Sequence, residues 1–153
     1  MKEYIMKQAC KHLKVSSYLV LILAAMNFLQ LLAELFYGDL NAVELPEGSP
    51  ENILLITKII LLVVSLLLML PRIHVGVKGL KVAEHPDDSK GHIVWAIIIF
   101  VLALVDLMEP VVGLVKQEDI GNNVGGLLSI LLEVLVYFDY IKYALAVRND
   151  KKK

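Results

Sequence analysis

Four long apolar blocks constrain this chain more than any other feature of its sequence. They cover about residues 16–37, 53–70, 93–115 and 124–147. At about 1.5 Å of rise per residue, a helix of roughly 18–24 residues matches the ~30 Å hydrocarbon core of a bilayer. The blocks lack the strict alternation of polar and apolar residues that membrane strands show. They predict an all-α integral membrane four-helix bundle, a single domain over residues 1–153.

The composition supports a membrane protein. Hydrophobic residues make up 58% of the chain and the mean hydropathy is +0.68, whereas an average soluble protein is roughly 45–50% apolar. The net charge of −1 argues against a nucleic-acid partner, and the blocks imply that the lipid bilayer is the main partner. The segments between the blocks are too short to bury a core of their own.

Basic residues are distributed unequally among the segments outside the blocks. The N-terminal segment, the connection between the second and third blocks and the C-terminal end carry Lys2, Lys7, Lys11, Lys14, Arg72, Lys78, Lys81, Lys90, Lys142, Arg148, Lys151, Lys152 and Lys153. The other two connections carry only Lys116, together with several carboxylates. The positive-inside rule then predicts a multi-pass protein of the cell membrane with both termini in the cytoplasm.

The segment before the first block predicts a short amphipathic helix. The apolar residues of segment 1–14 recur every four positions, at Ile5, Ala9 and Leu13. Lysines lie elsewhere around the helix, which favours a position at the cytoplasmic interface. Cys10 lies in this segment, where it is either a lipidation or redox site or an unmodified thiol.

The connection between the second and third blocks allows several interpretations. Its histidines and carboxylates suggest a metal site, at Glu84, His85, Asp87, Asp88 and His92. Their spacing matches no metal signature, and Pro86 followed by two aspartates is typical of a turn. We therefore expect neither a metal nor a cofactor. Gly76, Lys78, Gly79 and Lys81 predict either close helix packing or a turn that ends the helix beside anionic lipid headgroups.

Ionisable residues inside the blocks are the strongest functional signal. They come from all four blocks: Glu34, Lys58, Asp106, Glu109 and Glu133. A charge at the bilayer centre costs roughly 2.5–3.5 kcal/mol, so these side chains should face the bundle interior or water. Their positions place them all in the outer half of the membrane.

Helical spacing groups the polar residues of each block on one face. The four groups are Asn27, Gln30 and Glu34; Lys58 and Ser65; Asp106 and Glu109; and Ser129, Glu133, Tyr137 and Tyr140. If all four faces turn inward, the bundle has a polar interior. Pro110 removes the usual donor to the carbonyl of Asp106, which predicts a kink beside that carboxylate.

Two interpretations of the charges fit this pattern. In the first, an outward-facing polar cavity binds a cation, a proton or a small polar solute. Lys58 is then the counter-ion, and Asp106 and Glu133 change charge. In the second, Lys58 pairs with Asp106 or Glu109, while Glu133 fixes helix register.

The stretch Gly76-Val77-Lys78-Gly79-Leu80-Lys81-Val82-Ala83, followed by Pro86 and Lys90-Gly91, resembles a pattern of one group of proteins. These are uncharacterised small four-span membrane proteins of Gram-positive anaerobic bacteria, in which a glycine- and lysine-bearing turn joins the second and third spans. The resemblance covers residues 76–91. It implies the same topology and a bacterial cytoplasmic membrane, and it brings no activity and no functional residues.

Known catalytic signatures are absent from the sequence, which contains no His-Glu-x-x-His motif, phosphate loop or nucleophile–base pair. We therefore expect no enzyme. The short loops favour an interaction, regulatory or assembly subunit, acting with a membrane-protein partner or as a homo-oligomer. The alternative is a transport or channel-like protein that binds an ion or small solute at Lys58, Asp106 and Glu133.

Overall fold

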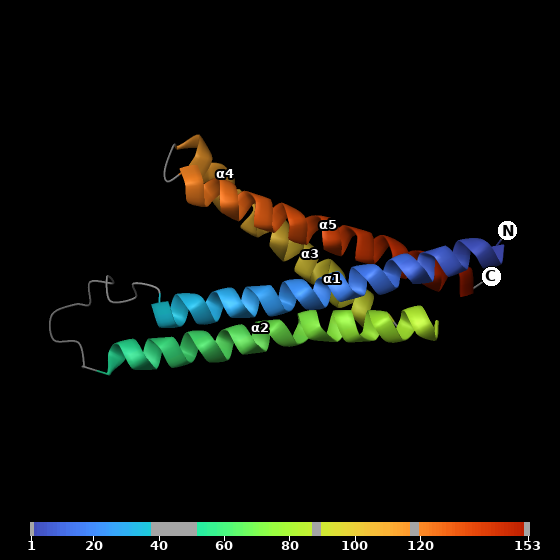
Figure 1. The fold of residues 1–153 in the computed structure, drawn as a ribbon, viewed down its shortest axis with the longest axis horizontal. Helices are drawn as coiled ribbons and strands as arrows, with labels where there is room; N and C mark the ends of the chain where they lie inside the picture. Colours follow the sequence, from blue (N-terminus) through green and yellow to red (C-terminus); the bar gives the residue numbers. More distant parts are fainter. Residues whose placement is uncertain (1, 38–51, 87–89, 117–119, 152–153) are drawn as a thin grey trace.

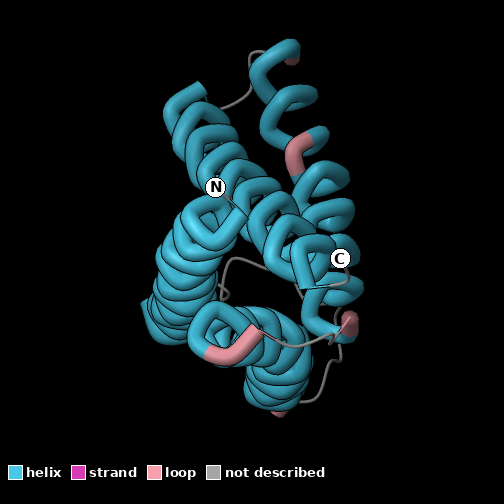
Figure 2. Tube along the Cα trace, turned by 90° about the vertical axis from the view of Figure 1, so that its right-hand side faces the viewer, coloured by secondary structure: helices cyan, strands magenta, loops and turns pink. Residues whose placement is uncertain are grey.

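The computed structural model describes residues 2–37, 52–86, 90–116 and 120–151. These residues form five helices, α1 (Lys2–Tyr37), α2 (Ile53–Glu84), α3 (Gly91–Asp106), α4 (Met108–Val115) and α5 (Ile120–Lys151). Loops in this part of the chain are short (Figure 2). Four stretches of it are long and apolar enough to cross a membrane: Tyr4–Ala33, Leu55–Glu84, Gly91–Val115 and Asn123–Asn149. The prediction of an all-α four-helix bundle is confirmed.

The helices form two hairpins that meet at one end and diverge at the other (Figure 1). The first hairpin is α1 with α2, and the second is α3 and α4 with α5. Both termini lie at the end where the hairpins meet (Figure 1). We call this part the closed half, comprising residues 2–25, 72–86, 90–103 and 134–151. The remaining described residues, 26–37, 52–71, 104–116 and 120–133, form the open half.

The buried apolar core lies entirely in the closed half. Its members are Ala9, Leu13, Val20, Leu23, Val75, Val82, Ile93, Ala96, Ile99, Val136, Tyr137, Tyr140, Ala144 and Val147. Among the described side chains of the open half, only Leu35, Pro110 and Gly113 are buried. The two hairpins are therefore held together at one end only.

Two glycines of α2 explain why the closed half packs so tightly. A Cβ atom added to Gly79 would lie 2.3 Å from Oγ of Ser17 and 2.5 Å from Cε2 of Tyr140. A Cβ atom added to Gly76 would lie 2.5 Å from Cγ of Leu21. Small residues of this kind let helix backbones approach closely within a membrane. The hydroxyl of Tyr140 also donates a 2.9 Å hydrogen bond to the carbonyl of Val75, which joins α5 to α2.

The second span is longer than the sequence predicts. The sequence predicts an end near residue 70, but α2 continues to Glu84 with Pro71 inside the helix. Gly76, Lys78, Gly79 and Lys81, for which the sequence allows either close helix packing or a helix-ending turn, are therefore helical, and the turn alternative is wrong. The packing in the closed half accounts for this, because Val75, Gly79 and Val82 recur at helical spacing and are all buried.

The described part of the N-terminal segment, residues 2–14, is continuous with the first span in one helix, α1. Ala9 and Leu13, from the apolar face assigned to the membrane interface, are buried in the core of the closed half. Ile5 from the same face is exposed. Cys10 is partly buried against this core.

The third pass is interrupted beside Pro110, as the sequence predicts. Helix α3 ends at Asp106 and α4 begins at Met108, with Leu107 between them. Pro110 lies in the first turn of α4, where its missing N–H costs no helical hydrogen bond. The interruption therefore lies directly after Asp106.

Candidate functional site

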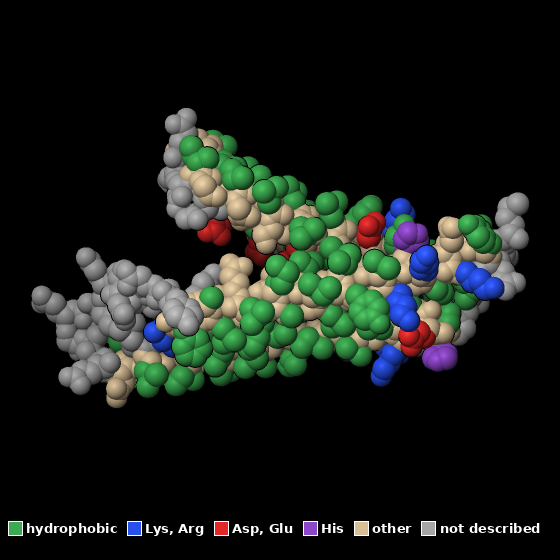
Figure 3. Space-filling view, viewed as in Figure 1, with side chains coloured by type: hydrophobic (Ala, Val, Ile, Leu, Met, Phe, Trp, Pro, Cys, Tyr) green, Lys and Arg blue, Asp and Glu red, His purple; other side chains and the backbone are tan. Residues whose placement is uncertain are grey.

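A cavity of about 540 Å³ lies between the hairpins, where they begin to diverge. Its lining comes from α1, α2 and the end of α3: Ala24, Asn27, Phe28, Gln30, Leu31, Ser65, Leu68, Met69, Arg72 and Asp106. In the space-filling view a notch separates the hairpins in the open half, and acidic side chains are visible in it (Figure 3). The cavity is therefore a polar site within the candidate membrane spans.

Arg72 is the cation of this cavity. Its Nη2 atom lies 2.9 Å from Oε1 of Glu133, and this ion pair joins α2 of the first hairpin to α5 of the second. The side chains are 25% and 12% exposed, so the pair is largely withdrawn from the surroundings. Burying either charge without the other would be costly, and the pairing explains how both are tolerated among apolar helices.

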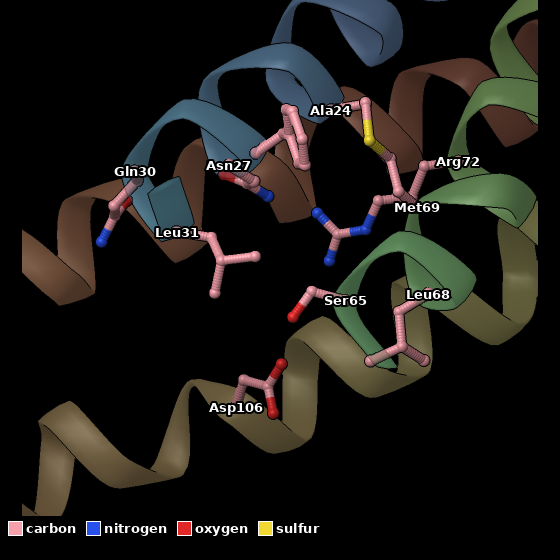
Figure 4. A pocket seen from close by; sticks show the side chains of 10 residues that line it. Ala24, Asn27, Gln30, Leu31, Ser65, Leu68, Met69, Arg72 and Asp106 are labelled. Carbon is pink, nitrogen blue, oxygen red and sulfur yellow. The ribbon is translucent and has the colours of Figure 1, made fainter. Parts of the chain in front are cut away.

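Asp106 supplies a second carboxylate to the cavity. Figure 4 shows its side chain pointing into the space towards Ser65 and Arg72. Within the part of the chain that the structure describes, its carboxylate forms no ion pair with Arg72, whose charge is already met by Glu133. The cavity therefore presents an acceptor and a cation that do not neutralise each other.

The remaining lining combines three polar side chains with five apolar ones. Asn27 and Gln30 of α1 bring amide groups, and Ser65 of α2 brings a hydroxyl (Figure 4). Phe28 and Met69 contribute apolar surface on the same two helices. Amides and hydroxyls can each donate and accept hydrogen bonds, so this wall suits a polar ligand that has an organic body.

The predicted polar faces meet only in part. Asn27, Gln30, Ser65 and Asp106 line the cavity, and Glu133 contacts it through Arg72. Lys58 does not line it, and among the described residues no ion pair joins Lys58 to Asp106 or Glu109. The side chain of Glu34 lies outside the described residues.

Glu109 belongs to a different place. It lines a second cavity of about 420 Å³ with Met108, Val112, Gly113, Lys116 and Asn123. This cavity lies between α4 and α5. The two helices are close together at Gly113, where an added Cβ atom would lie 2.5 Å from Nδ2 of Asn123. Glu109 therefore does not share the site of Asp106, although the two residues are three positions apart.

The histidine-rich connection forms no metal centre in the described part of the chain. No group of three or more His, Cys, Asp or Glu residues there could hold a metal ion, and Asp87 and Asp88 lie outside the described residues. His92 is 1% exposed and packs edge-on against Tyr140, with ring centroids 6.1 Å apart. His92 is thus part of the core at the start of α3.

Lysines of the closed half lie at its surface. Lys81 is exposed and Lys78 is half-buried. Lys14 of α1 forms an exposed ion pair with Glu84 at the end of α2, with 2.8 Å between Nζ and Oε1. Basic side chains near the ends of spans are suited to anionic lipid headgroups.

Sequence reasoning missed Arg72, the residue that organises the site. The predicted second span ends near residue 70, which places Arg72 in the connection that follows it. The signal that α2 continues was the helical spacing of Val75, Gly79 and Val82 after the proline. Comparison with known proteins adds no further assignment, because no family model, curated protein or solved structure matches this chain.

Proposed function

We propose that this protein is a transport-type membrane protein that binds a small polar or charged solute in the cavity between its hairpins. The observation that carries the proposal is that one cavity of about 540 Å³ contains both Arg72 and Asp106. Asp106 has no ion-pair partner there, because Arg72 pairs with Glu133. Binding pockets for small molecules commonly measure about 300–1,000 Å³ and have a few polar groups on a largely apolar wall. A charge retained inside a membrane span usually has a function.

The difference between the two halves of the bundle supports transport of the solute rather than binding alone. The open half gives a path between the hairpins to the cavity, while the closed half seals the far side with Leu13, Tyr137 and Tyr140, each at most 1% exposed. A binding site with access from one side is the arrangement that alternating access requires. The basic residues near the closed half favour a cytoplasmic position for it, in the cell membrane.

Each charged residue has a distinct role in this proposal. Asp106 binds the positive or hydrogen-bond-donating part of the solute, because it is the carboxylate that Arg72 leaves available. Glu133 holds Arg72 in place through their 2.9 Å contact. Arg72 thus takes the counter-ion role that sequence spacing assigned to Lys58.

The test is ligand binding and uptake by the reconstituted protein. Amines and amino acids would be screened by their effect on melting temperature, and active compounds would be followed into proteoliposomes. Asp106→Asn keeps the shape of the side chain and removes its charge, so binding should weaken at least tenfold with the melting temperature preserved.

The matched control is Glu109→Gln, a neighbouring carboxylate outside the main cavity. It should leave binding and uptake unchanged. If Asp106→Asn binds and transports as the unmodified protein does, or if no compound acts, the proposal is wrong.

A second candidate is a regulatory or assembly subunit. The observation in its favour is the exposed apolar surface of the diverging hairpins, where Phe36 and Val105 are 77% and 62% exposed. A partner helix packed against this surface would cover such residues. Purification in mild detergent tests this candidate: a recurrent partner supports it, and a monodisperse chain without partners counts against it.

A further inference from the structure

The cavity carries one charge of each sign on different helices, and this defines the class of solute. We propose that the ligand is a small zwitterion, with an ammonium group bound by Asp106 and an oxyanion bound by Arg72. The inference rests on the proposed function, since it names the solute of the same cavity. Arg72 belongs to α2 and Asp106 ends α3, so the ligand would bridge the two hairpins.

Arg72 is prepared to bind an oxyanion. A guanidinium has five N–H donors, and the contact with Glu133 is made by Nη2 at 2.9 Å. The side chain remains 25% exposed, and Figure 4 shows the guanidinium pointing into the cavity. Arg72 therefore has donors left for a carboxylate or phosphate, which a guanidinium binds in a two-pronged manner.

Glu133 explains why Asp106 is free for a cation. Because Glu133 already balances Arg72, the guanidinium is stable without drawing Asp106 towards it. Among the described residues, Asp106 has no ion-pair partner. An ammonium group is the natural complement of such a carboxylate, since charge-assisted hydrogen bonds are about twice as strong as neutral ones.

Ligands of a single sign fit this cavity less well. An anion at Arg72 would face the carboxylate of Asp106 across the cavity, and a cation at Asp106 would leave the remaining donors of Arg72 without an acceptor. A zwitterion meets both groups at once, because its ammonium balances Asp106 and its oxyanion accepts hydrogen bonds from the donors of Arg72 that Glu133 leaves available. Asn27 and Ser65 lie beside the guanidinium and can hydrogen-bond the polar body between the two ends (Figure 4).

The same chemistry occurs in two kinds of molecule. Amino acids in solution carry an ammonium and a carboxylate, whereas the phosphoethanolamine headgroup of a lipid carries an ammonium and a phosphate. Both kinds of molecule match the charges of Asp106 and Arg72, so the experiment must include each.

The experiment measures the melting temperature and binding of the purified full chain in detergent. Glycine, β-alanine and γ-aminobutyric acid form a series in which the two charges move apart, and methylammonium and acetate each carry only one of them. Short-chain phosphatidylethanolamine is compared with short-chain phosphatidylglycerol, whose headgroup lacks the ammonium. We expect one zwitterion to bind at least tenfold more tightly than every single-charge probe.

Two variants assign the ends of the ligand. Asp106→Asn should weaken zwitterion binding at least tenfold. Arg72→Lys keeps a cation beside Glu133, so the fold is retained. Lysine lacks the planar guanidinium that binds two oxygen atoms at once, so this variant should also weaken binding at least tenfold. Glu109→Gln should bind as the unmodified chain does.

The outcomes separate the two proposals. If methylammonium binds as tightly as the zwitterions and depends on Asp106, the zwitterion inference is overturned while the solute-binding function stands. Equal binding of zwitterions by Arg72→Lys and the unmodified chain also overturns it. If none of these probes binds, both proposals fail.

Discussion

The closed and open halves are built from the same four passes, yet only one of them is packed. In the closed half, Gly76 and Gly79 allow α2 to approach α1 and α5 until a Cβ atom would not fit. In the open half, glycines such as Gly113 serve packing within the second hairpin, and no such contact joins the hairpins. The comparison teaches that small residues decide where the hairpins meet, and that polar residues collect where they do not.

The largest expected effect comes from a substitution that disrupts the packing of the closed half. Gly79→Leu would place a side chain where even a Cβ atom lies 2.3 Å from Ser17. Overpacking of this kind should lower the free energy of unfolding by about 3 kcal/mol. The measurement is unfolding in mixed detergent micelles, followed by circular dichroism.

Gly125 provides the matched control, because it lies in α5 of the open half with nothing within 4 Å of an added Cβ atom. Gly125→Leu should keep or raise stability, since leucine favours a helix more than glycine does. Equal losses in the two variants would show that the halves do not differ in packing.

A smaller effect concerns the contact at the boundary between the halves. Glu133→Ala removes the partner of Arg72 and should lower the free energy of unfolding by about 2 kcal/mol. The value lies below that for a fully buried pair because Arg72 is 25% exposed. The same micelle titration measures it.

Glu84→Ala removes another inter-helix ion pair, Lys14–Glu84, whose side chains are 42% and 54% exposed. Exposed pairs contribute little to stability, so this variant should unfold as the unmodified chain does. A loss at Glu84 as large as the loss at Glu133 would contradict the distinct role of the Arg72 pair.

Much of the open half could be predicted from the sequence. The helical spacing of Asn27, Gln30, Ser65 and Asp106 predicts inward polar faces, and these residues do line one cavity. Such spacing works because an apolar surrounding penalises any other orientation of a polar side chain. Spacing within one helix cannot say which residues of different helices meet. The sequence therefore predicts Lys58, and not Arg72, as the counter-ion of the site.

The closed half was harder to predict because proline and charge dominate its sequence signals. Pro71 and the lysines after it are typical of a helix end, whereas the buried faces of α1 and α5 hold α2 helical as far as Glu84. Tertiary packing of Val75, Gly79 and Val82 thus overrides a local preference. In the sequence, only the spacing of these small and branched residues indicates that the helix continues.

Water access to the cavity is the central claim, and thiol labelling tests it directly. Ser65→Cys and Leu66→Cys would each be made with Cys10→Ala, since Cys10 is the only cysteine of the chain. Ser65 lines the cavity, whereas Leu66 is 43% exposed on the outer surface of the bundle. A thiol reacts through its ionised form, which forms in water and is suppressed in lipid.

A membrane-impermeant maleimide would be added to the outer side of intact membranes. The account predicts rapid labelling of Ser65→Cys and little labelling of Leu66→Cys. If Ser65→Cys is labelled no faster than Leu66→Cys, the space between the hairpins is not a water-accessible cavity, and the central claim is contradicted.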